Sequence, residues 1–233
     1  GSNCQVNRCL FTNTSSAINL HKAKNAVIEF NEITRWSGRG IDCNPVGGTN
    51  IRISRNYLHS PNNNKALGIN VGQQSKHQKI VANAIVEYNL LDGIRNDKSL
   101  YCKSSGNTVR YNTLINCQGI TNRHGFDNKY IGNYLEKCVS LRASDRNCQV
   151  EQNRLVNCRL GINVLAGDIT SKQVPSQGGG YPHAYGCNLI DNDSPRIEIG
   201  TKYNKWKKIF PADKTVVKGY KGKIYRRSEK NTR

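Results

Sequence analysis

The sequence predicts an all-β protein, a right-handed parallel β-helix in which short strands stack in successive coils. Three observations support this prediction: an internal repeat, short segments of alternating apolar residues, and a low apolar content. Only 36% of the residues are hydrophobic and 7% are aromatic. Such a composition suits a narrow core that runs along an elongated fold, and 233 residues are enough for one large domain or two small ones.

The repeat consists of an apolar residue, two variable residues, Asn, one variable residue, and Leu or Ile. Clear copies occupy residues 28–33, 53–58, 109–114 and 150–155, and weaker copies occupy residues 6–11, 130–135 and 189–192. In the first weak copy Cys9 takes the place of Asn. Residues 80–85, around Asn83, and residues 86–91, around Asn89, both fit, so the sequence leaves that register open. The anchors lie between 20 (Asn133 to Asn153) and 29 (Asn83 to Asn112) residues apart, which is typical of a solenoid.

Val, Ile and Tyr dominate the alternating segments and predict strands, whereas the intervening Gly and Asn predict turns. Leucine-rich repeats share the period, but their leucine spacing is absent. We expect each anchor Asn to adopt a positive φ at a tight turn and the stacked Asn side chains to form an amide ladder.

The residue five positions after the anchor is also predicted to stack from coil to coil. These residues are Trp36, Tyr88, Cys117, Cys138 and Cys158. We expect the last three to point inward as small hydrophobic residues of a reduced core, with a redox or metal role as the alternative. The chain has nine cysteines and no CxxC pair, which weighs against a structural zinc site.

The repeat also predicts the organisation of the chain. Residues 1–165 form the β-helix coils, which carry the candidate functional groove. Residues 166–200 form a loop rich in Gly and Pro and a final coil. Residues 201–233 form a basic tail or a cap over the open end of the solenoid.

The charge of the chain points to a polyanionic partner. The formal net charge is +19, from 35 basic and 16 acidic residues. Residues 201–233 hold 12 basic and 2 acidic residues, or +10, so +9 remains on the first 200 residues and the tail alone cannot define the function. We expect no membrane partner, because no apolar run reaches transmembrane length. No signal peptide is visible, and the absence of Met suggests that the sequence begins inside a longer protein.

The densest group of candidate functional residues lies between Lys98 and Arg146. Lys103 and Arg123 are 20 residues apart, and Arg123 and Arg142 are 19 apart. Each spacing corresponds to one coil, so the three side chains are predicted to lie on one face in adjacent coils. Lys98 is five residues before Lys103 and is expected to reach the same groove.

Four further residues are candidates for substrate binding. His124 either contacts the substrate or only orients Arg123, and Asn70 lines the groove upstream. Asp145 and Arg146 either bind substrate or form a surface pair, and Asp145 could orient Arg142.

At this point the sequence resembles a known family. Residues 103–113, Lys-Ser-Ser-Gly-Asn-Thr-Val-Arg-Tyr-Asn-Thr, followed by Arg123-His124-Gly125, are similar to the signature of polysaccharide lyase family 6, which contains alginate lyases and chondroitinase B. The resemblance is close over residues 98–153 and weaker over residues 3–165. It implies cleavage of a uronic-acid polysaccharide by β-elimination, with Lys103 as the Brønsted base, Arg123 as the Brønsted acid and Arg142 as a substrate-gripping residue.

The chain departs from this family at its metal site. The family carries acidic residues just before the lysine that hold calcium, whereas this chain has Asn96 and Lys98 there, and Asp97 is the one nearby acid. Calcium sites usually need several oxygens including carboxylates. We therefore expect no metal and no cofactor, with the Lys98 ammonium in place of calcium. The alternative is that the activity has changed or been lost.

The expected partner is an acidic polysaccharide such as alginate, glucuronan, a glycosaminoglycan or a bacterial capsule, and this substrate class implies an extracellular or periplasmic location. Three other functions stay open. A non-catalytic β-helix, such as a spike or adhesin module, would bind the same substrate without cutting it. A uronate epimerase would abstract the same proton and return one to the opposite face. A nucleic-acid binder driven by the basic tail is the third, and it is the least expected because the tail contains no known binding motif.

Overall fold

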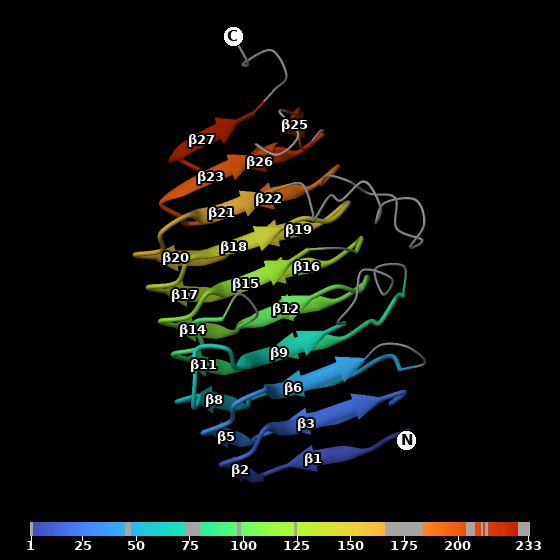
Figure 1. The fold of residues 1–233 in the computed structure, drawn as a ribbon. Helices are drawn as coiled ribbons and strands as arrows, with labels where there is room; N and C mark the ends of the chain where they lie inside the picture. The colour runs from blue at the N-terminus through green and yellow to red at the C-terminus, as the bar shows by residue number, and fades with distance from the viewer. Residues whose placement is uncertain are drawn as a thin grey trace.

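The computed structural model describes residues 2–44, 48–72, 80–96, 99–123, 125–165, 184–203, 208–210, 212 and 214–227. In these residues the chain winds into a right-handed parallel β-helix, which confirms the predicted fold class (Figure 1). Each full coil contributes one strand to each of three parallel sheets, so strands distant in sequence lie side by side. No helix capable of crossing a membrane occurs in the described part of the chain.

The three sheets run along the length of the stack. Sheet 1 contains β1 (Gln5–Asn7), β4 (Val27–Glu29), β7 (Arg52–Ser54), β10 (Ile85–Glu87), β13 (Thr108–Arg110), β16 (Lys129–Ile131), β19 (Gln149–Glu151), β22 (Asn188–Ile190) and β26 (Val216–Lys218). Sheet 2 contains β2 (Leu10–Thr12), β5 (Glu32–Thr34), β8 (Tyr57–His59), β11 (Leu90–Asp92), β14 (Thr113–Ile115), β17 (Tyr134–Glu136) and β20 (Arg154–Val156). Sheet 3 contains β3 (Ser16–His21), β6 (Arg39–Asn44), β9 (Leu67–Val71), β12 (Leu100–Cys102), β15 (Gly119–Asn122), β18 (Ser140–Ala143), β21 (Gly161–Val164), β23 (Arg196–Ile199) and β27 (Lys223–Arg226).

The C-terminal part of the chain continues the stack. β22 and β23 lie within residues 166–200 and add one strand each to sheets 1 and 3, while residues 166–183 of the expected loop lie outside the described residues. In the segment expected to be a tail or cap, β26 pairs with β22 and β27 pairs with β23, so both add strands to existing sheets. β24 (Thr201–Tyr203) and β25 (Lys208–Phe210) form a separate antiparallel pair.

The amide ladder predicted from the repeat runs through the turn between sheet 1 and sheet 2. Its members are Asn31, Asn56, Asn89, Asn112, Asn133, Asn153 and Asn192. From Asn56 onward, each Oδ1 accepts hydrogen bonds from the backbone N and the Nδ2 of the preceding member. For example, Asn112 Oδ1 lies 3.1 Å from Asn89 N and 2.9 Å from Asn89 Nδ2. Cys9 begins the series, because its backbone N donates to Asn31 Oδ1.

The ladder assigns the register that the sequence left open. Asn89 and not Asn83 belongs to it, so the residue five positions on is Ile94, which is fully buried. The placement of Tyr88 in this row was therefore wrong, and its side chain is 47% exposed. The three residues expected to point inward, Cys117, Cys138 and Cys158, are buried as predicted, and Trp36 of the same row is also buried.

The expectation that each anchor Asn adopts a positive φ is wrong. A positive φ occurs at the residue before the ladder Asn, such as Phe30 (56°), Arg55 (53°) and Tyr88 (55°), and not at the Asn itself. The sharp bend is therefore made by the preceding residue. The Asn is selected because its amide can both donate and accept, which satisfies buried backbone groups of the adjacent coils.

Candidate active site

Sheet 3 presents two faces with different residues, because successive side chains of a strand point to opposite sides. One row faces the core and includes Ile69, Leu100, Ile120 and Leu141, which are fully buried. The adjacent row faces away from the core and carries mainly polar side chains. In coil order it contains Asn19, Asp42, Asn70, Tyr101, Thr121, Arg142, Asn163, Glu198 and Tyr225.

Lys103 and Arg123 follow strands β12 and β15 directly. Cys102 pairs with Asn122, so continuing the register places Lys103 beside Arg123 in the next coil. Their backbones extend the hydrogen bonding of sheet 3: Lys103 N donates to Val71 O at 2.9 Å, and Arg123 N donates to Cys102 O at 3.4 Å. The structure thus brings together the two residues that the sequence predicted to be one coil apart.

Both cations contact the ring of Tyr101, a residue that the sequence analysis missed. Lys103 Nζ lies 5.4 Å and Arg123 Cζ lies 5.7 Å from the ring centroid, within the range of a cation–π interaction. Tyr101 is 1% exposed, so the ring is a buried and well-defined support. A signal was present, because residues two apart in a strand share a face, and Tyr101 is two residues before Lys103.

Arg142 belongs to the same outward face, as predicted from its spacing. It pairs with Thr121 in the sheet register, and its Nε donates to Ser144 Oγ at 3.0 Å. Continuing this register places Ser144 beside Arg123, so the Arg142 side chain turns toward the Arg123 position. The two arginines and Lys103 therefore lie in three adjacent coils of one face.

Asn70 also lies in the outward row, beside Tyr101, and is 3% exposed. Its side chain is hydrogen-bonded to Asp42, whose pKa is raised because burial penalises the charged carboxylate. Asp42 is paired with Arg39 at 2.6 Å. Asn70 therefore supports the floor of the face, and its contact with substrate stays a prediction.

Asp145 is placed differently from the prediction. It is 1% exposed, and its Oδ2 accepts a hydrogen bond from Asn128 Nδ2 at 2.9 Å inside the helix. Burial raises its pKa to about 7. The expectations that Asp145 binds substrate, orients Arg142 or forms a surface pair are therefore wrong: Arg142 points outward and Asp145, three residues later, points inward.

The other predicted site residues are placed as follows. Arg146 is half-buried, with its guanidinium 5.0 Å from the ring centroid of Tyr185, in the turn that leads from sheet 3 to sheet 1. Lys98 and His124 lie outside the described residues. Upstream of them, the Asn96 amide donates to Lys65 O at 2.8 Å and supplies no carboxylate, so the described residues before Lys103 do not fit a calcium site.

The backbone at Gly125 shows why the Arg-His-Gly segment needs a glycine. Its φ is 121°, and a Cβ at this position would lie 2.5 Å from the carbonyl oxygen of Ser104. Only glycine allows such an approach. Gly125 can therefore lie directly against Ser104.

Comparisons with known proteins agree with this architecture. A solved structure of the alginate lyase AlyF-OU02 in complex with G6 is similar, with a TM-score of 0.62 and 15% identity. The alignment covers 93% of this chain and 54% of that enzyme, so the chain spans about half the length of the lyase. At this identity the likeness shows a common fold. No curated protein matches the sequence. The family described as right-handed β-helix region matches residues 1–189, and the chain belongs to this family.

Proposed function

We propose that the protein is a polysaccharide lyase that cleaves a uronic-acid-containing polysaccharide by β-elimination, with Lys103 as base and Arg123 at the leaving oxygen. The observation that carries this proposal is the contact of Lys103 and Arg123, from adjacent coils, with the same buried ring of Tyr101. The alginate lyase fold of the similar solved structure supports it.

The proposed reaction needs a base and a concentration of positive charge. The base removes the proton on C5 of the uronate, the C4–O bond breaks, and a C4–C5 double bond forms. Negative charge develops on the uronate carboxyl and then on the leaving oxygen, so preorganised cations lower the barrier. Lys103 takes the proton, and Arg142 faces the carboxylate. Arg123 donates a hydrogen bond to the leaving oxygen, which takes its proton from water.

The charge balance of the outward row favours an anionic substrate. Its two carboxylates, Asp42 and Glu198, are held by arginines of their own or neighbouring coils, Arg39 at 2.6 Å and Arg227 at 2.7 Å. Neither carboxylate lies in the coils of Lys103 and Arg123. The coils of Lys103 and Arg123 lie between those of Asp42 and Glu198. A uronate carboxylate bound there would meet these cationic side chains and no acidic side chain of this row.

The test is an ultraviolet assay for unsaturated uronates on a panel of alginate, glucuronan, glycosaminoglycans and capsules, with and without EDTA. We expect product from at least one polymer and no loss of rate after brief EDTA treatment. Binding without product would contradict the lyase function and favour a non-catalytic binding module. Inversion at C5 without a double bond, detected by NMR, would identify an epimerase.

Tyr101 is expected to position the two cations rather than to react. Tyr101→Phe keeps the ring and should retain most of the rate, whereas Tyr101→Leu removes the ring and should lower kcat by about tenfold, because a cation–π contact contributes about 0.5–2 kcal/mol. The rates and KM values of both variants, together with their melting temperatures, check this prediction. Equal loss in both variants would instead assign the effect to the hydroxyl.

A further inference from the structure

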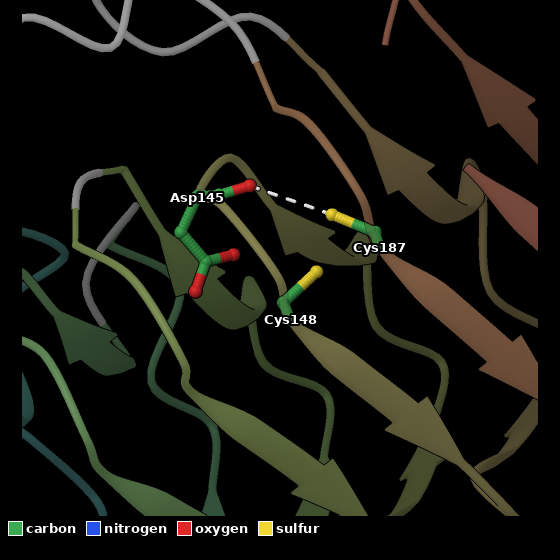
Figure 2. Close-up of side chains that lie close together, drawn as sticks. All are labelled: Asp145, Cys148 and Cys187. Atoms are coloured by element: carbon green, nitrogen blue, oxygen red, sulfur yellow. Dashed lines mark hydrogen bonds between the residues drawn. The ribbon is translucent and has the colours of Figure 1, made fainter. Parts of the chain in front are cut away.

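A second cluster of chemically active side chains lies inside the β-helix, away from the outward face of sheet 3. It consists of Asp145, Cys148 and Cys187 (Figure 2). Cys148 precedes β19 and Cys187 precedes β22, and the pairing of these strands places the two cysteines at the same position in adjacent coils. All three residues are buried, and one ligand atom from each lies within 4.8 Å of the others.

One oxygen of the Asp145 carboxylate is held by a hydrogen bond, and the other oxygen has no hydrogen-bond partner. Oδ2 accepts the 2.9 Å hydrogen bond from Asn128 Nδ2, and Oδ1 is buried with no hydrogen-bond partner. Asn128 is itself fixed, because its Oδ1 accepts from Asn107 Nδ2 at 3.0 Å. A buried oxygen without a partner is costly, and a carboxylate held in this way resembles a metal ligand with its supporting hydrogen bond.

We propose that Asp145, Cys148 and Cys187 form a binding site for a thiophilic divalent cation, with Zn²⁺ as the best fit. Two sulfurs and a carboxylate oxygen are typical zinc donors, whereas calcium and magnesium require oxygen ligands. The main-chain oxygen of Asp145, 3.4 Å from Cys187 Sγ, lies at the same place and offers a fourth donor (Figure 2).

Binding of a divalent cation at this cluster balances in protons and in charge. Binding of Zn²⁺ would exchange the two thiol protons for two Zn–S bonds and release these protons to solvent. The net charge left in the core is then −1, and the Asn128 amide donates to the oxygen that shares it.

The site has a structural consequence that does not depend on the proposed lyase function. A cation held by Cys148 and Cys187 would join two adjacent coils. In sequence the two cysteines are separated by residues 149–186, which include the long connection after β21. Closing a long connection restricts the unfolded chain. Sequence reasoning missed the site because Asp-x-x-Cys followed by a distant Cys has no recognised ligand spacing.

The experiment uses the full chain, refolded with Zn²⁺ or with Co²⁺ as a spectroscopic probe, because the closed core limits entry into the folded protein. Metal content after desalting is measured by mass spectrometry, thiolate ligation by the thiolate-to-cobalt charge-transfer absorption, and stability by thermal unfolding. We expect one ion per chain, the charge-transfer band, and a higher melting temperature than for metal-free protein. A wild-type chain that retains no ion, or an intact mass lower by two hydrogens because Cys148 and Cys187 form a disulfide, would overturn the proposal.

Two matched variants locate the site. The double variant Cys148→Ala with Cys187→Ala should lose the ion, whereas Cys117→Ala with Cys158→Ala, which removes two other buried cysteines, should retain it. Asp145→Asn leaves both thiols in place and should weaken the affinity for Co²⁺ by at least about tenfold. Equal metal retention by both double variants would show that these residues do not bind the ion, and the cobalt spectrum of the wild type decides the question even if a variant fails to fold.

Discussion

Replacing Lys103 with alanine is expected to lower the rate of uronate elimination by a factor of about 10²–10⁴, the usual contribution of a positioned acid or base. The lysine is half-buried against Tyr101, at the end of β12. Its backbone N bonds to Val71 O and would keep this bond in the variant. The fold should therefore persist while the proton acceptor is lost. Initial rates of double-bond formation on the best substrate of the panel measure the effect.

Two controls separate the loss of the base from the loss of a charge. Lys129 is exposed on β16 in sheet 1, and Lys129→Ala removes one positive charge away from sheet 3; its rate should stay close to that of the wild type. Lys103→Arg keeps the positive charge but replaces the amine with a group that stays protonated. This variant should therefore bind the polymer without cleaving it. An active Lys103→Ala protein would remove Lys103 from the mechanism.

Replacing Asn112 with alanine is expected to lower the free energy of unfolding by about 3 kcal/mol, since each buried polar group left unsatisfied costs about 1–3 kcal/mol. Asn112 Oδ1 accepts from both nitrogens of Asn89, and Asn112 Nδ2 donates to Val86 O and to Asn133 Oδ1. Alanine supplies none of these bonds in a fully buried position. Urea unfolding followed by circular dichroism measures the change.

The matched control for the ladder is Asn19→Ala on β3, where the side chain is exposed. Its effect should stay within about 0.5 kcal/mol, as is usual for surface substitutions. If the Asn112 and Asn19 variants unfold at the same urea concentration, the ladder does not stabilise the protein. If Asn112→Ala changes the dependence of the unfolding free energy on urea concentration (the m-value), the coils on one side of Asn112 unfold separately.

Much of the fold could be predicted because its repeat is local. An Asn flanked by apolar residues recurs in coil after coil, so one sequence pattern specifies the ladder, the turn and the neighbouring strands. The register around Asn83 and Asn89 could not be assigned, because both six-residue segments satisfy the pattern. What decides between them is the neighbouring coils, where Asn56 and Asn112 both bond to Asn89, and a single segment does not contain that information.

The candidate site was predicted in part for the same reason. A spacing of one coil correctly placed Lys103 beside Arg123, because residues in equivalent positions stack in a solenoid. The prediction for Asp145 was wrong because an ionisable side chain just after a strand usually lies at the surface, whereas alternation from Arg142 places this one inward. Tyr101 was missed because a tyrosine between apolar neighbours resembles a core residue, and only the structure shows which face it occupies.

The unequal sequence spacing of the ladder residues distinguishes the stacked strands, which are constant, from the connections, which vary in length. Successive asparagines are 25, 33, 23, 21, 20 and 39 residues apart. Much of the additional length in the two longest intervals lies between sheet 3 and sheet 1, after β9 and after β21. Closing a longer loop adds little free energy, so connections there can lengthen while the stacked strands stay unchanged. Lys103 and Arg123 lie at the start of two such connections. Exchanging neighbouring connections is therefore expected to alter polymer selectivity while the proposed catalytic pair stays unchanged.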